Sequence, residues 1–145
     1  MASIAHQKQV FRLTLAVYVF FVAIVSVKIL FIGPGQIPDA AVAYINWWSQ
    51  QPQSHLERFV GWAGLVAALA SIIAALGMAL FASWARVLFI VAVAVLIGSE
   101  FFMDYPILKT PIENFFDSLA GALSGAIIVF SYCSGITNEF SQSAP

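Results

Sequence analysis

The stretch "FVGWAGLVAALASIIAALGMALFA", residues 59–82, decides the fold class, because it runs for 24 residues without a charged side chain. About 20 mostly apolar residues in a helix are enough to span the hydrocarbon core of a bilayer. The stretch has no period-two alternation of polar and apolar residues, which disfavours a strand, and in lipid a helix satisfies its own backbone polar groups. We therefore predict a membrane-spanning helix at residues 59–82.

Three further apolar runs have a similar length, at residues 10–32, 85–103 and 116–136. The whole chain is 61% hydrophobic and 9% charged, with a mean hydropathy of +0.93. A water-soluble domain of 145 residues exposes a large share of its area and could not cover so much apolar surface. We therefore predict an all-α integral membrane protein, in which residues 1–145 form one domain built as a four-helix transmembrane bundle.

The orientation of the bundle follows from the Lys and Arg residues near the span ends, which favour the cytoplasmic side. The two possible sides divide the cations equally, into Lys8, Arg12 and Arg86 against Lys28, Arg58 and Lys109. The pair that precedes the first span usually dominates, and the segments on the opposite side carry six of the seven acids. We therefore predict that both termini lie in the cytoplasm. Short loops and the lack of an Asn-x-Ser/Thr site favour a bacterial inner membrane.

The connection between the first and second spans is long enough to hold a further element. Residues 38–50 within it fit a short helix that lies in the membrane interface. Tandem Trp47 and Trp48 suit the headgroup region, where Trp is enriched, and Trp84 has a similar setting in the connection at residues 83–86. These residues are predicted to be interfacial anchors, and a surface for docking a partner is the alternative for residues 38–50.

Local signals mark three of the predicted helix ends. The segments "SHLE" (54–57) and "TPIE" (110–113) both fit a capping box, in which Ser or Thr is followed three residues later by Glu. Pro111 suits the first position of a helix, where its missing N–H costs nothing. Gly135, close to the last apolar residue, is expected to stop the fourth span.

Small residues indicate where the helices approach closely. Lipid tails are as apolar as leucine, so helices in a bilayer associate through close backbone contact at small side chains. Two such surfaces are predicted, one in the second span at Ala63, Ala67, Ser71, Ala75 and Ala79, and one in the fourth span at Gly121 and Gly125. The two surfaces either meet within one chain, which we favour, or contact a second copy.

Charged residues gather near one predicted level of the membrane. At about 1.5 Å per residue, Lys28 lies roughly 24 Å beyond Arg12, and Glu100 lies roughly 21 Å beyond Arg86. In a hydrocarbon core about 30 Å thick, both lie just beneath the outer headgroups. Two more acids, Asp104 and Asp117, fall close to the same level.

Three interpretations of this charged cluster compete. Lys28 can extend its long stem to water, which gives a solvated rim without further meaning. Alternatively Lys28 pairs with Glu100, with Asp104 or Asp117 as the second acceptor, and the pair fixes the helices. In the third interpretation the carboxylates bind a cation or relay protons, against which stands the lack of an acid at the bilayer midplane.

Other chemistry is poorly supported. A net charge of −1 with six Lys and Arg residues argues against a nucleic-acid partner. His6 and His55 lie on opposite sides of the predicted membrane, and Cys133 is the single cysteine, which suits a small packing residue better than a nucleophile. No catalytic triad, phosphate loop or haem-type histidine pair is present. We therefore predict no catalytic site, no metal and no cofactor.

Two stretches, "LFASWARVLFI" (80–90) and "SGAIIVFSYCSGITNEF" (124–140), resemble a loosely defined, uncharacterised group of small four-helix bacterial inner-membrane proteins. The shared features are a Trp-Ala-Arg turn and a Tyr-x-Ser before a final Phe, which are here Trp84, Ala85, Arg86, Tyr132, Ser134 and Phe140. Gly135 departs from the group, where proline is more usual. The first half of the chain, with Arg12 and Lys28 around an apolar span, is also similar to DoxX-like proteins. It departs from them in its second span, which lacks the internal acid expected of such proteins. The resemblance implies a fold and a compartment but no chemistry.

The sequence therefore favours a non-enzymatic inner-membrane protein that works through contacts with other proteins in the bilayer. It would be an immunity-type or modulatory protein, or an accessory subunit of a membrane complex, and its partner would be another membrane protein or a second copy. The alternative function is a small transporter or ion-binding protein that uses Lys28, Glu100 and Asp104.

Overall fold

A computed structural model describes residues 4–31, 42–44, 46–47, 50, 52, 54–102 and 111–142, and the side chains of all of these except residues 25–31, 111–113 and 142. The long helices in this part are α1 (Ile4–Phe31), α3 (His55–Ala79), α4 (Ser83–Phe101) and α5 (Pro111–Cys133). A short 3-10 helix, η1 (Gly135–Asn138), and α6 (Glu139–Gln142) follow. Of the helices in the described part of the chain, four are long and apolar enough to cross a membrane, as predicted.

The helices begin earlier than the predicted spans, because a helix can continue beyond the apolar run from which each span was predicted. α1 begins at Ile4 and α3 at His55. The capping box at the start of α3 is confirmed: the Glu57 N–H donates to Ser54 Oγ at 3.1 Å, and the Ser54 N–H donates to Glu57 Oε2 at 2.7 Å. α5 begins at Pro111, in keeping with the predicted helix start, and Thr110 of the second predicted box lies outside the described residues.

The turn between α3 and α4 lies three residues earlier than predicted. The chain turns at residues 80–82, and Ser83 and Trp84 already belong to α4. The Ala82 N–H donates to the Gly77 carbonyl at 3.0 Å and the Phe81 N–H to the Met78 carbonyl at 3.0 Å, which is a Schellman ending. Phe81 adopts φ 59°, in the left-handed region that glycine normally fills. The prediction missed this turn because an apolar run without glycine at its end gives no signal for it.

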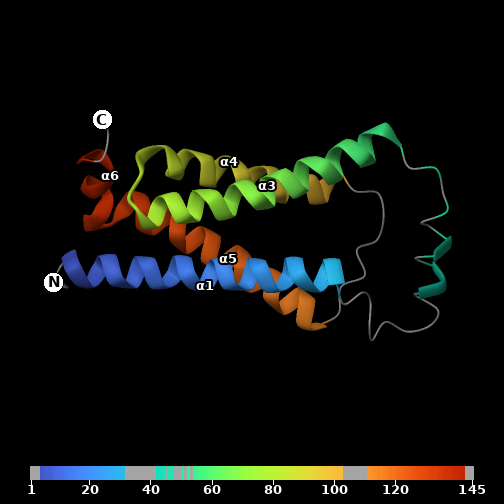
Figure 1. Ribbon diagram of the computed structural model, residues 1–145, viewed down its shortest axis with the longest axis horizontal. Coiled ribbons are helices and arrows are strands. Elements are labelled where there is room, and N and C mark those ends of the chain that lie inside the picture. Colours follow the sequence, from blue (N-terminus) through green and yellow to red (C-terminus); the bar gives the residue numbers. More distant parts are fainter. Residues whose placement is uncertain are drawn as a thin grey trace.

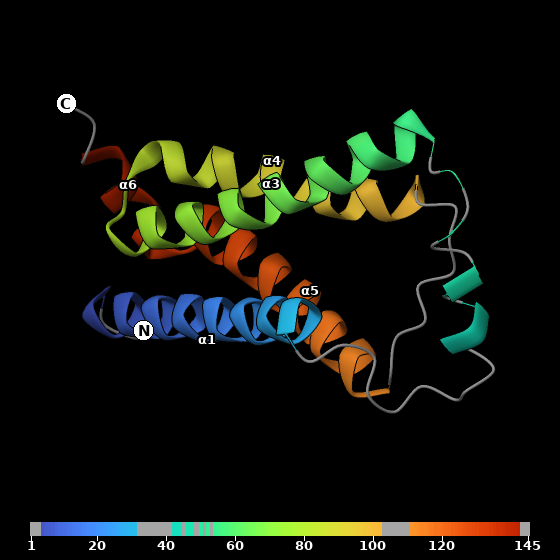
Figure 2. The same cartoon turned by 45° about the vertical axis from the view of Figure 1, so that its right-hand side comes forward.

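The four long helices form two pairs. α1 packs mainly on α5, and α3 packs along α4 (Figure 1). The start of α1, the α3–α4 turn, the end of α5 and α6 all lie at one end of the bundle, which we name the terminal end. The opposite end, where α3 and α5 begin, is the distal end. Toward it the α1–α5 pair diverges from the α3–α4 pair in both views (Figures 1 and 2).

The hydrophobic core lies in the terminal half of the bundle. From α1 it takes Phe11, Leu15 and Tyr18, and from α3 it begins only at Ala74. The remaining members of the buried cluster are Ala75, Met78, Phe81, Ala85, Phe89, Ile127, Ile136 and Phe140. Tyr18 is 2% exposed and donates its hydroxyl to Ser71 Oγ at 3.2 Å. This bond joins α1 to α3 inside the apolar core, where an unpaired hydroxyl would be costly.

The C-terminal segment, residues 134–142, packs against the terminal end of the bundle. α5 ends at Cys133, two residues before the predicted stop, and the Ser134 side chain accepts a bond from the Ile136 N–H at the start of η1. A Cβ placed on Gly135 would lie 2.8 Å from Gln7 Oε1, so this glycine permits a close approach of α1. Ile136 and Phe140 are completely buried as a result.

The predicted interfacial segment is described only in part. Residues 42–44 and 46–47 are helical, and the rings of Tyr44 and Trp47 lie 5.7 Å apart. The rest of residues 38–50, Trp48 included, lies outside the described residues apart from Gln50.

Candidate functional site

An aromatic cluster closes the terminal end of the bundle. Phe11 of α1 lies 6.2 Å from Phe81 of the α3–α4 turn, 6.0 Å from Phe130 of α5 and 6.0 Å from Phe140 of α6, measured between ring centroids. Phe81 and Phe140 meet edge to face at 5.2 Å. Aromatic pairs at these distances contribute about 0.5–1.5 kcal/mol each beyond their buried area. The cluster therefore ties α1, the turn, α5 and the C-terminal segment together.

Three cations surround this cluster. Lys8 Nζ lies 5.6 Å and the Arg12 guanidinium 5.3 Å from the Phe81 ring centroid, and the Arg86 guanidinium lies 4.6 Å from that of Phe140. Lys8 also forms an ion pair with Glu139 at 2.9 Å. Cations are attracted to the negative face of an aromatic ring, so the cluster holds its cations at the rim of the apolar core.

Two of these cations also satisfy backbone carbonyls near helix ends. Arg12 Nε donates to the Ala79 carbonyl at 3.2 Å, and an Arg86 amino group donates to the Ser131 carbonyl at 3.4 Å. The last carbonyls of a helix lack partners within the helix, and cations there are favourable. Each of these contacts joins two segments of the chain, so together they hold the terminal end of the bundle in place.

The predicted charged cluster is described only in part. Glu100 is exposed in the last turn of α4, and Asp117 is half-buried in the second turn of α5. Lys28 lies in α1, but its side chain is outside the described residues, as is the whole of Asp104. Among the described residues, no three His, Cys, Asp or Glu side chains could jointly hold a metal ion. The Lys28–Glu100 contact stays a prediction.

The small-residue surface of α3 lies against its neighbours. Ala67, Ser71 and Ala75 are buried, and Ala63 and Ala79 are half-buried. Gly64 lies next to this surface, and a Cβ there would lie 3.3 Å from Ser99 Oγ of α4. The backbones of α3 and α4 therefore approach each other closely, in the way that small residues permit.

The glycine surface of α5 does not pack within the chain in the way that we favoured from the sequence. Gly121 and Gly125 are exposed, and a Cβ placed on either would meet open space. α5 instead turns Ser124, Ile127 and Ser131 inward. The spacing of small residues alone could not decide which face of α5 packs inside the chain, because Ser124, Ile127 and Ser131 also recur every three to four residues. The exposed face, named the α5 small-residue face, consists of Ser118, Gly121, Ala122, Gly125 and Ala126.

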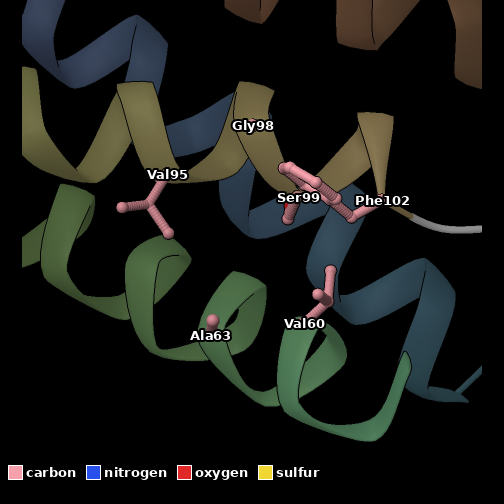
Figure 3. A pocket seen from close by; sticks show the side chains of 6 residues that line it. All are labelled: Val60, Ala63, Val95, Gly98, Ser99 and Phe102. Carbon is pink, nitrogen blue, oxygen red and sulfur yellow. The ribbon is translucent and has the colours of Figure 1, made fainter. Parts of the chain in front are cut away.

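A small pocket opens between α3 and α4 near the distal end. It measures about 230 Å³ and is lined by Val60, Ala63, Val95, Gly98, Ser99 and Phe102 (Figure 3). Its one polar side chain, Ser99, donates to the Leu96 carbonyl of its own helix at 2.7 Å. Ligand sites usually span about 300–1,000 Å³ and carry several polar groups that orient the ligand. This pocket is smaller and has one polar side chain, whose hydroxyl proton is already bonded to the Leu96 carbonyl, so nothing in it favours a polar ligand.

The predicted interfacial anchors have exposed rings where they are described. Trp47 is 57% and Trp84 is 54% exposed. The far edge of the Trp84 ring also covers Gly77, since a Cβ on this glycine would lie 3.0 Å from Cη2. Trp84 thus has a packing role in the hairpin that its position in the sequence did not reveal.

Comparison with known protein families, curated proteins and solved structures gave no match. The features that can assign a role are therefore those of the chain itself. Sequence reasoning missed the aromatic cluster, for which the one signal was the isolated Phe140 after the fourth apolar run, four residues beyond Ile136.

Proposed function

We propose that this chain is a non-enzymatic integral membrane protein that acts by contacting another protein within the bilayer, through the α5 small-residue face. The partner is a different membrane protein or a second copy of the chain. The observation that carries the proposal is the exposure of Gly121 and Gly125, both with open space above them.

The other exposed faces support this choice by contrast. On α3 the outward residues are bulky: Trp62 is 67%, Leu69 is 56% and Leu76 is 59% exposed. Bulky apolar side chains suit contact with lipid tails. A face of glycine, alanine and serine lets another helix backbone approach closely, and this approach is what drives helix association in a bilayer. The α5 face is therefore suited to a helix, and the α3 face to lipid.

The proposed setting is a bacterial inner membrane, with the terminal end in the cytoplasm. Lys8, Arg12 and Arg86 all lie at the terminal end, where Glu139 is the one acid among the described residues. Cytoplasmic ends of spanning helices carry an excess of Lys and Arg. Four crossings would also bring the start of α1 and the end of α5 to the same side.

Recovery of the protein from membranes by gentle solubilisation tests the proposal. The natural chain should be recovered with a stoichiometric partner, which can be another protein or a second copy. Gly125→Leu or Gly121→Leu should abolish this association while the protein accumulates normally, because the added side chain holds the partner helix away. Gly61→Leu is the matched control, since a Cβ at Gly61 also meets open space but on α3. A partner that survives both α5 changes, or repeated recovery of a monomer alone, would overturn the proposal.

A second function, ion binding or transport, is favoured by Glu100 and Asp117, which lie on the distal parts of α4 and α5. For transport, Lys28→Ala or Glu100→Gln should abolish activity at normal accumulation. For a purely structural ion pair, either change should lower accumulation, and removal of both charges together should partly restore it.

A further inference from the structure

Arg12 of α1 is held at the level at which α3 ends. Its Nε donates to the carbonyl of Ala79, the last residue of α3, at 3.2 Å, and its guanidinium lies 5.3 Å from the Phe81 ring centroid. These two contacts fix the side chain beside the α3–α4 turn, yet Arg12 remains exposed. Since α3 is long and apolar enough to span a bilayer, its end marks the level at which hydrocarbon gives way to headgroups.

The guanidinium of Arg12 keeps hydrogen-bond donors that the fold does not use. A guanidinium carries five N–H donors in a rigid fork, and one of them meets the Ala79 carbonyl. Within the part of the chain that the structure describes, its two terminal amino groups have no hydrogen-bond partner. The other cations of the terminal end are more engaged, because Lys8 pairs with Glu139 at 2.9 Å and Arg86 is half-buried. Arg12 is therefore the cation of this end that is most available to an anion.

Positive side chains outnumber acids around Arg12. Residues 4–12, 79–90 and 130–142, which meet at the terminal end (Figure 1), contain three Lys or Arg residues and one acid, Glu139. Lys8 precedes Arg12 by four residues, which places both on one face of α1. Lys8 Nζ also lies 5.6 Å from the centroid of the same Phe81 ring. This end of the bundle therefore favours a ligand with net negative charge over a zwitterionic one.

An exposed apolar surface on α3 ends beside this cation. It consists of Leu69, Ile73, Leu76 and Leu80, all of them exposed. These residues recur every three to four positions, so they share one face of the helix. The last of them, Leu80, directly follows the residue whose carbonyl Arg12 contacts. An acyl chain requires an apolar surface of this kind next to the cation, whereas a soluble phosphate does not.

We propose that Arg12 binds the phosphate of an anionic phospholipid whose acyl chains lie along this face of α3, with Lys8 as the neighbouring cation. The planar fork of Arg matches two phosphate oxygens at once. A charge at the edge of the hydrocarbon is costly unless it is paired, and a lipid phosphate is an anion that the bilayer itself supplies at that level. This inference rests on the membrane insertion that the proposed function assumes, but it is independent of the α5 small-residue face.

Native mass spectrometry of the purified full chain in detergent micelles tests the site, because it resolves the binding of one lipid at a time. The probes are phosphatidylglycerol and the zwitterionic phosphatidylcholine, with identical acyl chains. The first phosphatidylglycerol should bind more tightly than the first phosphatidylcholine. Arg12→Gln should reduce this preference about fivefold, which is the effect of one cation near an anionic lipid surface. Arg58→Gln is the matched control, since it removes one cation near the start of α3, and it should leave the preference unchanged.

A second variant should raise the affinity, which a damaged fold could not explain. Glu139→Gln removes the ion-pair partner of Lys8. Lys8 is then free to contact the same phosphate, so the preference for phosphatidylglycerol should rise about fivefold. A preference that does not rise in this variant would contradict the part given to Lys8.

Three other results would overturn the site. They are equal affinity of the natural chain for the two lipids, an Arg12→Gln change that weakens both lipids alike, and displacement of phosphatidylglycerol by inorganic phosphate at the same concentration. Binding of neither lipid would count against membrane insertion as well, whereas the three results above leave insertion untouched. Failure of this inference can therefore be told apart from failure of the proposed function.

Discussion

When Phe81 is replaced, the glycine variant should be more stable than the alanine variant, although alanine is usually the more stabilising of the two residues. Phe81 has φ 59°, and a residue with a Cβ pays about 1–2 kcal/mol to adopt the left-handed region. Glycine adopts it freely. Glycine also gains about 0.5–1 kcal/mol of conformational freedom in the unfolded chain relative to alanine, which partly offsets the relief. We therefore expect Phe81→Gly to be more stable than Phe81→Ala by about 0.5–1 kcal/mol.

Both variants should be less stable than the natural chain. Phe81 is 8% exposed, and its ring lies 6.2 Å from Phe11 and 5.2 Å from Phe140. The centre of the Phe81 ring also lies 5.6 Å from Lys8 Nζ and 5.3 Å from the Arg12 guanidinium carbon, which are cation–π contacts. Truncation of a buried Phe to Ala costs about 3–5 kcal/mol in soluble cores, so the loss of the ring outweighs the relief of backbone strain. The strained residue is kept because its ring completes the aromatic cluster.

Denaturant titration in mixed micelles measures both effects, with helical circular dichroism as the signal of unfolding. The comparison of the two variants removes the contribution of the ring, which both of them lack. An alanine variant that equals or exceeds the glycine variant in stability would refute the assignment of strain to Phe81. A variant of either kind as stable as the natural chain would refute the role of the ring.

Two further substitutions probe the packing of α3. Gly77→Ala should lower the free energy of unfolding by about 1–3 kcal/mol, because overpacking a tight contact is costly and the new Cβ would lie 2.8 Å from Ala85 Cβ. Gly98→Ala is the matched control. It should be neutral or stabilising, because a Cβ on Gly98 meets open space. An equal loss of unfolding free energy in both variants would contradict the close approach of α3 to α4 at Gly77. Tyr18→Phe removes the donor to Ser71 Oγ. It should lower the free energy of unfolding by about 0.6 kcal/mol, the average for hydrogen bonds between membrane helices. The same denaturant titration measures this loss, and a loss no larger than the experimental error would show that the bond contributes nothing.

The positions of the long helices could be predicted from the sequence because the signal is local. An apolar run of about 20 residues without period-two alternation favours a helix, whatever its neighbours are. The Ser54–Glu57 capping box is equally local, and it forms as predicted. The predicted spans were accordingly close, although α1 begins six residues before the expected Val10.

The choice of which faces meet could not be read from the sequence. Nearly every face of these helices is apolar, so hydrophobicity does not separate the faces that pack inside the bundle from the faces that stay exposed. Both the Ala67 surface of α3 and the Gly125 surface of α5 are rich in small residues, yet the first is buried and the second is exposed. The difference depends on how the pairs cross, which is a property of the whole bundle.

The sequence by itself determined that the long helices α1, α3, α4 and α5 form and roughly where each one lies, because long apolar runs and end-capping signals act within a few residues. The tertiary structure alone decided that Phe81 adopts a left-handed backbone conformation, that Phe140 is buried in the core and that the Tyr18 hydroxyl donates a hydrogen bond to Ser71. Each of these joins segments far apart in the chain. Such contacts depend on distances that only the packed helices define.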